Sequence, residues 1–258
     1  MAIKATFLGT GTSSGVPIIG CDCPVCTSED PRDRRRRTSL YIEAGGLHVL
    51  VDTPPDLREQ ALAYRLPRVD AVFFTHSHAD HIFGFDDIRR YNTIQREVIP
   101  AFGGESTIRD LQRVFNYIST ECQPGAYRPQ IDFRIISDLV NLGALTIEML
   151  PVVHGPAPTN GFLFTCDAVR FAYVPDCKVI PPETLARLKG VDVMVLDALR
   201  HRDHATHLTI AQSLSYLEQI GAARSYLIHL CHEVAHAELE HALPAGVAVA
   251  YDGLCVQC

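Results

Sequence analysis

The first half of the chain alternates short apolar runs with polar turns. Residues 3–8 and 69–74 have the length and composition of strands. Two further runs, 38–42 and 47–51, flank Gly45-Gly46 and predict a β-hairpin. Apolar positions recur at helical spacing over three stretches, 56–64, 82–91 and 107–118.

The second half adds more strands, with helices between them. The predicted strands cover 132–136, 145–152, 161–165, 169–174, 191–196, 225–229 and 247–251. Three helices are predicted: one directly after Pro181-Pro182, one over 209–220 and one over 235–243. Two sheets packed face to face with helices outside satisfy this pattern, so we expect an α/β (α+β) sandwich. No repeat or linker interrupts it, and we expect one domain over residues 1–258.

The composition narrows the class of protein. The 258 residues are 47% hydrophobic and 21% charged, as in ordinary globular proteins. No apolar run approaches the roughly 18 residues that span a bilayer, and the N-terminal segment lacks a secretory pattern. We therefore expect a cytoplasmic protein without a membrane partner. The net charge of −7 disfavours broad nucleic-acid binding. The one basic run, 34–37, is open to two interpretations: a solvated loop, or an edge that faces phosphate.

Cysteine and histidine are the residue types that point to chemistry. Nine cysteines without an export pattern argue against a disulfide framework and for metal. His76-x-His78-x-Asp80-His81 places four candidate ligands directly after the predicted strand 69–74. Imidazole and carboxylate suit zinc, iron or manganese. Three further candidates each follow an apolar run, namely His154, Asp176 and His229.

These residues resemble, in order along the chain, the motifs of the metallo-β-lactamase-fold hydrolases. The fold that this resemblance implies is a four-layer αββα sandwich around two divalent cations, zinc or manganese. One cation would be bound by His76, His78 and His154, and the other by Asp80, His81 and His229. Asp176 would bridge the two cations. Asp52, at the end of the strand 47–51, resembles the acid that orients a ligand.

With a bridging carboxylate at Asp176, the chain resembles the phosphodiesterases, nucleases and thioesterases of this superfamily more than its β-lactamases. Two divalent cations, two carboxylates and a bridging hydroxide carry a net charge of about +1, which complements one phosphodiester. We expect the hydroxide to attack phosphorus, with Asp80 as a second group that holds this nucleophile. His207 resembles the proton donor of the branch that contains tRNA 3′-processing nucleases and small phosphodiesterases. Asp197 would keep it cationic, and His204 is the alternative donor.

A second cluster lies at Cys21-x-Cys23-x-x-Cys26. Three thiolates in six residues suit a tetrahedral zinc ion, and a redox cluster or inert thiols are the alternatives. With His232 as fourth ligand, the cluster resembles the structural zinc site of the phosphodiesterase of the carbon–phosphorus lyase pathway (PhnP type). Cys255-x-x-Cys258 is a weak redox motif. The remaining cysteines are expected to be small buried residues, namely Cys122, Cys166, Cys177 and Cys231.

Three functions therefore stay open. The first is hydrolysis of a small phosphodiester, such as a cyclic ribose phosphate from phosphonate metabolism or a 2′,3′-cyclic nucleotide. The second is endonucleolytic tRNA 3′ processing, which the acidic composition disfavours. The third is a non-enzymatic metal-dependent carrier that resembles the pyrroloquinoline quinone biosynthesis protein. A homodimer is compatible with each of them.

Overall fold

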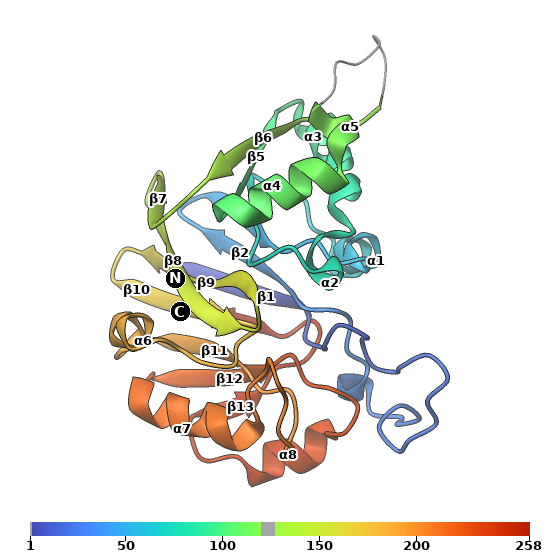
Figure 1. Cartoon of the computed structure of the whole chain (residues 1–258), viewed down its shortest axis with the longest axis vertical. Coiled ribbons are helices and arrows are strands. Elements are labelled where there is room, and N and C mark those ends of the chain that lie inside the picture. The colour runs from blue at the N-terminus through green and yellow to red at the C-terminus, as the bar shows by residue number, and fades with distance from the viewer. Residues whose placement is uncertain (1, 120–126) are drawn as a thin grey trace.

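The computed structural model describes residues 2–119 and 127–258 and contains two seven-stranded sheets (Figure 1). The first sheet has the order β14-β1-β2-β3-β4-β5-β6. Its strands are β1 (Ile3–Gly9), β2 (Ser39–Ala44), β3 (Leu47–Val51), β4 (Ala71–Phe73), β5 (Ile99–Gly103), β6 (Ile131–Ile135) and β14 (Cys255–Gln257).

The second sheet has the order β13-β12-β11-β10-β9-β8-β7. Its strands are β7 (Leu139–Leu142), β8 (Leu145–His154), β9 (Ala157–Cys166), β10 (Val169–Val174), β11 (Val193–Asp197), β12 (Arg224–Ile228) and β13 (Val247–Val249). Both sheets are mixed, because antiparallel hairpins are followed by parallel strands in each of them.

Helices cover the outer faces of both sheets. On the first sheet lie α1 (Leu57–Ala63), α2 (Ala79–Ile82), α3 (Arg89–Gln95), α4 (Glu105–Val114), α5 (Asn116–Ser119) and the 3-10 turn η2 (Phe85–Ile88). A second 3-10 turn, η1 (Pro31–Asp33), belongs to the loop between β1 and β2. On the second sheet lie α6 (Pro182–Leu188), α7 (Ile210–Ile220) and α8 (His236–Ala242). The two sets of helices occupy opposite sides of the molecule (Figure 1), and the expected αββα sandwich is confirmed.

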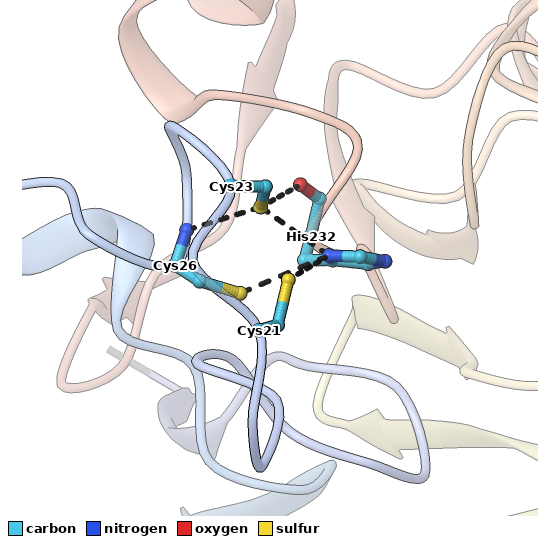
Figure 2. Close-up of side chains that lie close together, drawn as sticks. All are labelled: Cys21, Cys23, Cys26 and His232. Carbon is cyan, nitrogen blue, oxygen red and sulfur yellow. Dashed lines mark hydrogen bonds between the residues drawn. The ribbon is translucent and has the colours of Figure 1, made fainter.

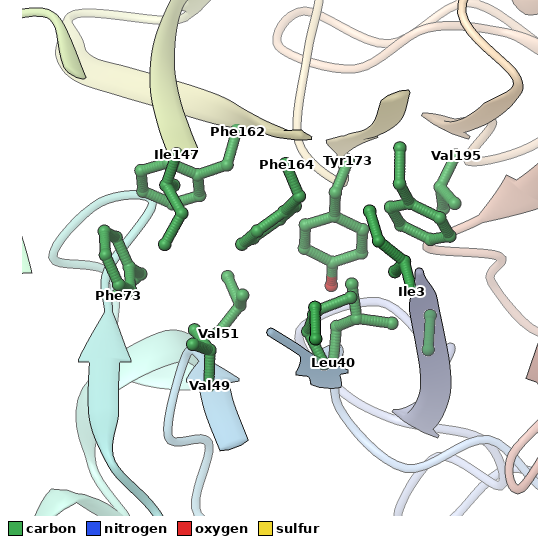
Figure 3. Packing of buried hydrophobic residues seen from close by; sticks show 14 of the residues in the cluster. Ile3, Leu40, Val49, Val51, Phe73, Ile147, Phe162, Phe164, Tyr173 and Val195 are labelled. Atoms are coloured by element: carbon green, nitrogen blue, oxygen red, sulfur yellow. The ribbon is translucent and has the colours of Figure 1, made fainter. Parts of the chain in front are cut away.

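The main apolar core lies between the two sheets. Side chains from facing strands meet there, among them Phe73, Phe162 and Tyr173 (Figure 3). Phe73 stacks on Phe102 at 4.7 Å and meets Phe162 edge to face at 5.5 Å, arrangements that the ring quadrupole favours. Each sheet is joined to its own helices by one further apolar cluster. Among the described residues, none of the helices combines the length and the hydropathy that crossing a bilayer requires.

The elements differ from the sequence predictions in five places. The helix predicted over 82–91 is divided among α2, η2 and α3, and the helix predicted over 107–118 is divided between α4 and α5. Strands β5, β7 and β14 are additional; β7 and β14 are too short for a clear alternation of polar and apolar positions, and β5 contains a proline and ends in glycine. Three of the cysteines expected to be buried are so, namely Cys166, Cys177 and Cys231, whereas Cys122 lies outside the described residues.

Candidate metal centre

The topology brings the carboxyl ends of the parallel strands to one edge of the sandwich. In the first sheet, β3 and β4 run parallel, so Asp52 and His76 emerge beside each other. In the second sheet, β10, β11 and β12 run parallel. They deliver Asp176, Asp197 and His229 to the same edge, the position at which α/β sheets present functional groups.

The seven predicted ligands of the dinuclear site lie together at this edge. Candidate ligand atoms lie within 4.8 Å of one another in three overlapping groups: His76, His78 and His154; His76, His81 and Asp176; and Asp80, His81 and His229. Asp176 is at the centre of the cluster. Its carboxylate oxygens lie 3.4 Å from His81 Nε2, 3.6 Å from His154 Nε2 and 3.4 Å from His229 Nε2.

Several of these atoms are buried without a hydrogen-bond partner. His81 Nε2, Asp176 Oδ1 and His229 Nε2 are in this state. Buried polar atoms are normally paired, so an unpaired group of imidazole and carboxylate atoms that face one another fits a cation. Burial lowers the pKa of His229 to about 3, which keeps this imidazole neutral, the form that binds a metal. The residues present therefore fit the expected pair of divalent cations.

Other residues fix the orientation of the histidine rings. His81 Nδ1–H donates to Asp52 Oδ2 over 2.8 Å, and the backbone N–H and hydroxyl of Thr75 donate to the same carboxylate. His154 Nδ1–H donates to the carbonyl oxygen of Thr206 over 2.8 Å. In both rings Nε2 is thereby left to face the cluster. The sequence indicated Asp52, but it carried no signal for the carbonyl of Thr206.

The predicted proton donor lies beside the cluster. His207 Nδ1–H donates to Asp197 Oδ2 over 2.8 Å, and the His207 ring stacks on His229 at 4.6 Å. Burial opposes the charge on His207, but the charge and hydrogen bond of Asp197, together with the carboxylates of Asp176 and Asp80, outweigh it and raise the pKa of the imidazole. The alternative donor, His204, lies 5.1 Å from His207 and is partly exposed. Its Nδ1 accepts a hydrogen bond from the Thr206 backbone N–H over 3.3 Å.

The second predicted cluster also assembles. The Sγ atoms of Cys21, Cys23 and Cys26 lie 3.3, 3.4 and 3.7 Å from His232 Nδ1. Figure 2 shows the three thiols gathered around the imidazole. The backbone N–H of Cys26 lowers the pKa of the Cys23 thiol to about 6, which favours the thiolate that binds metal. Three sulfurs and one nitrogen fit a tetrahedral zinc ion.

Within the basic run 34–37, Arg35 is neither in a solvated loop nor on an edge that could face phosphate. This side chain is 1% exposed and forms an ion pair with Asp33 at 3.1 Å. It also donates to the carbonyl oxygens of Cys231 and Val234 over 2.9 and 2.8 Å. Arg35 therefore joins the cysteine loop to the segment that carries His229 and His232, and the sequence gave no sign of this burial.

Comparison with known proteins identifies relatives along the whole chain. The family described as "Beta-lactamase superfamily domain" matches residues 48–230. A diphosphatase of the PhnP family has a crystal structure with a TM-score of 0.91 and 39% identity, covering 99% of this chain and 98% of that one. Zn²⁺-bound PqqB from Methylobacterium extorquens has a TM-score of 0.81 and 20% identity, covering 99% and 100% of the two chains.

One curated relative is a longer protein than this chain. An octanoyltransferase of Porphyromonas gingivalis is 34% identical over 263 residues, which are 98% of this chain and 51% of that protein. The chain thus spans about half the length of this relative. The family match, together with the αββα sandwich, shows that the chain belongs to the β-lactamase superfamily and has the metallo-β-lactamase fold.

Proposed function

We propose that the protein is a metal-dependent phosphoric diester hydrolase that acts on a small phosphodiester. The observation that carries this proposal is the combination of the ligand cluster around Asp176 with the His207–Asp197 pair beside it. One relative is named a diphosphatase of the PhnP family, and this name supports phosphoryl hydrolysis as the class of reaction.

Two divalent cations bound at the cluster would lower the pKa of a shared water and stabilise charge on phosphoryl oxygens. His76, His78 and His154 would hold one of them. Asp80, His81 and His229 would hold the other, with Asp176 between the two. Asp80 is the more accessible of the two carboxylates in the cluster and would orient the attacking water.

The leaving group needs a proton, and in this proposal His207 supplies it. A departing alkoxide is a strong base, so a positioned acid accelerates its loss. Asp197 holds the Nδ1 side of the ring, which leaves Nε2 to donate the proton. The Cys177 backbone N–H donates to the same Asp197 oxygen over 2.8 Å and fixes the carboxylate in place.

The three cysteines and His232 would hold a zinc ion with a structural role. Arg35 connects this site to the segment 229–234, so the zinc ion would order the same segment that supplies a ligand to the dinuclear site. A non-enzymatic carrier is the second candidate, because the PqqB structure shares the fold. The position of His207 favours the hydrolase, since a carrier has no need of a proton donor.

Hydrolysis of bis(p-nitrophenyl) phosphate tests the proposal directly. Protein loaded with Mn²⁺ or Zn²⁺ should release p-nitrophenol, and His76→Ala should abolish this turnover and reduce the metal content at the dinuclear site. His241→Ala changes an exposed histidine outside both clusters and serves as the matched control. Absence of turnover with either metal in the unmodified protein would favour the carrier instead.

A further inference from the structure

The ring of His229 has no hydrogen-bond partner among the described residues. Two other candidate ligands, His81 and His154, each have Nδ1 hydrogen-bonded, whereas both ring nitrogens of His229 are buried and unpaired. The ring stacks on His207 at 4.6 Å, a contact that restrains its tilt but directs neither nitrogen. Without a side-chain or carbonyl partner at Nδ1, the backbone of His229 sets the direction in which the ring points.

The backbone of His229 has a conformation that residues other than glycine rarely adopt. Its φ is +64°, in the left-handed region. Such a conformation persists only where the surrounding structure imposes it. On the N-terminal side, the carbonyl of Ile228 accepts from the Ala198 N–H over 2.9 Å, next to the regular pairing of β11 with β12. Strand β12 ends at Ile228, so other contacts hold the chain beyond His229.

The loop after β1 makes the first of these contacts. Leu230 N–H donates to the carbonyl of Thr10 over 3.2 Å, and Thr12 N–H donates to the carbonyl of Leu230 over 3.3 Å. Gly11, between these two threonines, packs against the backbone of Arg35. A Cβ on Gly11 would lie 2.8 Å from the carbonyl oxygen of Arg35, so only glycine allows this approach. The chain around Gly11 therefore lies between Leu230 and Arg35.

The guanidinium of Arg35 makes the second contact. Its Nη1 donates to the carbonyl oxygen of Cys231 over 2.9 Å, and its Nη2 donates to that of Val234 over 2.8 Å. The backbone of Arg35 is itself fixed, because it exchanges two hydrogen bonds of 2.8 Å with Val16. One planar group on a fixed backbone thus holds two carbonyls of the segment that begins two residues after His229.

The burial of Arg35 is not explained by stability alone. Burial lowers the pKa of the guanidinium, and acidic groups led by Asp33 only partly offset this effect. A buried ion pair often stabilises a fold no more than apolar residues of similar volume would. The carbonyls of Cys231 and Val234, in contrast, need a donor at these two positions. The contacts of Arg35 therefore point to a role in fixing the path of the chain.

We propose that Arg35 is a positioning residue for the candidate metal ligand His229. By holding the carbonyls of Cys231 and Val234, its guanidinium fixes the chain after His229 and thereby the direction of the imidazole. This backbone contact takes the place of the Nδ1 hydrogen bond that orients the other ligands. The inference concerns the cation that His229 would bind. It rests on the dinuclear site of the proposed function and not on the reaction catalysed there.

Calorimetric titration with Mn²⁺ tests this role without turnover. Mn²⁺ suits carboxylate ligands and not thiolates, so the titration reports on the dinuclear site. His229→Ala identifies the binding step that depends on His229. Arg35→Met should weaken that step about tenfold, as loss of a group that orients a ligand does, and should change the other step by less than about twofold. Arg32→Met removes an exposed arginine from the same loop and should change neither step.

A double variant separates positioning from general stability. Arg35→Met alone leaves the buried Asp33 carboxylate without its cation, so the melting temperature should fall. Adding Asp33→Asn removes this charge, and the amide oxygen can still accept from the His236 N–H. The melting temperature of the metal-free protein should then rise again. The His229-dependent Mn²⁺ step should stay weak, because no guanidinium holds the two carbonyls.

The two measurements together decide the proposal. An unchanged step in Arg35→Met would overturn it, and so would equal weakening of both steps. Recovery of Mn²⁺ affinity together with the melting temperature in the double variant would assign Arg35 a structural role only. If Arg35→Met alone does not fold, the double variant carries the same titration. If the protein cleaves no phosphodiester but the His229-dependent step still weakens, the proposed function fails and the positioning role stands.

Discussion

The two ring nitrogens of His207 have different surroundings, and this difference defines its expected role. Nδ1 is committed to Asp197, while the ring lies against His229 and His154 of the cluster. His204 has the reverse arrangement, because its Nδ1 only accepts from Thr206 and no carboxylate is hydrogen-bonded to it among the described residues. The geometry therefore favours His207 over His204 as the acid.

Replacing His207 with alanine should lower kcat on an ester with an alkoxide leaving group by about 10²–10⁴, because a positioned acid is lost. The loss on a p-nitrophenyl ester should be much smaller, since that leaving group needs little protonation. Both catalytic metals should stay bound, as elemental analysis would show. His204→Ala is the control and should affect neither ester strongly. A similar loss of kcat on both esters in His207→Ala would instead indicate a role in substrate binding.

The Asp197 carboxylate sets the pH range in which His207 is an acid. Burial opposes the imidazolium, but Asp197 and the nearby carboxylates of Asp176 and Asp80 together outweigh it, so the pKa of His207 is raised. A general acid must be protonated, and activity should fall as pH rises through this raised pKa. Asp197→Asn removes the charge, lowers the pKa of His207 and should move the alkaline limb of the kcat profile to lower pH. An unmoved limb would mean that another group titrates there.

At the scale of elements, the loop between β1 and β2 connects the two proposed metal sites. It contains the three cysteines, and Arg35 near its end holds the carbonyls of Cys231 and Val234. The carboxylate of Asp33 accepts from both Arg35 and the His236 backbone N–H. The two terminal nitrogens of the buried guanidinium are therefore paired, whereas its Nε has no partner among the described residues. This loop and the segment 229–236 form one joined unit.

Replacing Cys23 with serine should remove about one zinc ion per chain and lower the melting temperature, because the binding energy of a structural metal contributes to folding. Some hydrolytic activity should remain, since no ligand of the dinuclear site is changed. Cys255→Ser alters an exposed cysteine outside the cluster and is the control. Full metal content and an unchanged melting temperature in Cys23→Ser would show that the thiols bind no structural metal.

Contiguous signals in the sequence predicted most of these elements and most of the site. The histidine motif is local in the sequence. The strands of the second sheet bring His154, Asp176 and His229 to it, so ligands that are spread over more than half of the chain meet at one edge of the sandwich. Contacts made by backbone or by isolated side chains were not predictable. The hydrogen bond to the carbonyl of Thr206 and the burial of Arg35 depend on partners that no spacing rule connects.

At the scale of the whole molecule, the dinuclear cluster joins the two sheets. His76, His78 and His81 come from the edge of the first sheet, whereas His154, Asp176 and His229 come from the second. Cations bound there would link the sheets at one end of the apolar core. The stability of the sandwich should then depend on metal concentration.

Chelation should lower the melting temperature of the protein by an amount that grows with metal affinity. Metal at 1,000 times its dissociation constant stabilises the folded state by about 4 kcal/mol, and chelation removes this contribution. His76→Ala should respond less to the chelator, because its dinuclear site is already impaired. Identical melting curves with and without metal would show that the cluster does not link the sheets.

The pairing of β1 with β14 has a consequence for synthesis on the ribosome. Lys4 faces Gln257 in this pair, and the hydroxyl of Thr10 donates to Asp252 over 2.8 Å, so β1 is translated some 250 residues before its partner strand β14. Contacts of such long range form slowly. Until then β1 has one open edge, which is a site for unwanted strand addition. The nascent chain should therefore need chaperone protection longest at its first strand, well after the histidine motif has been translated.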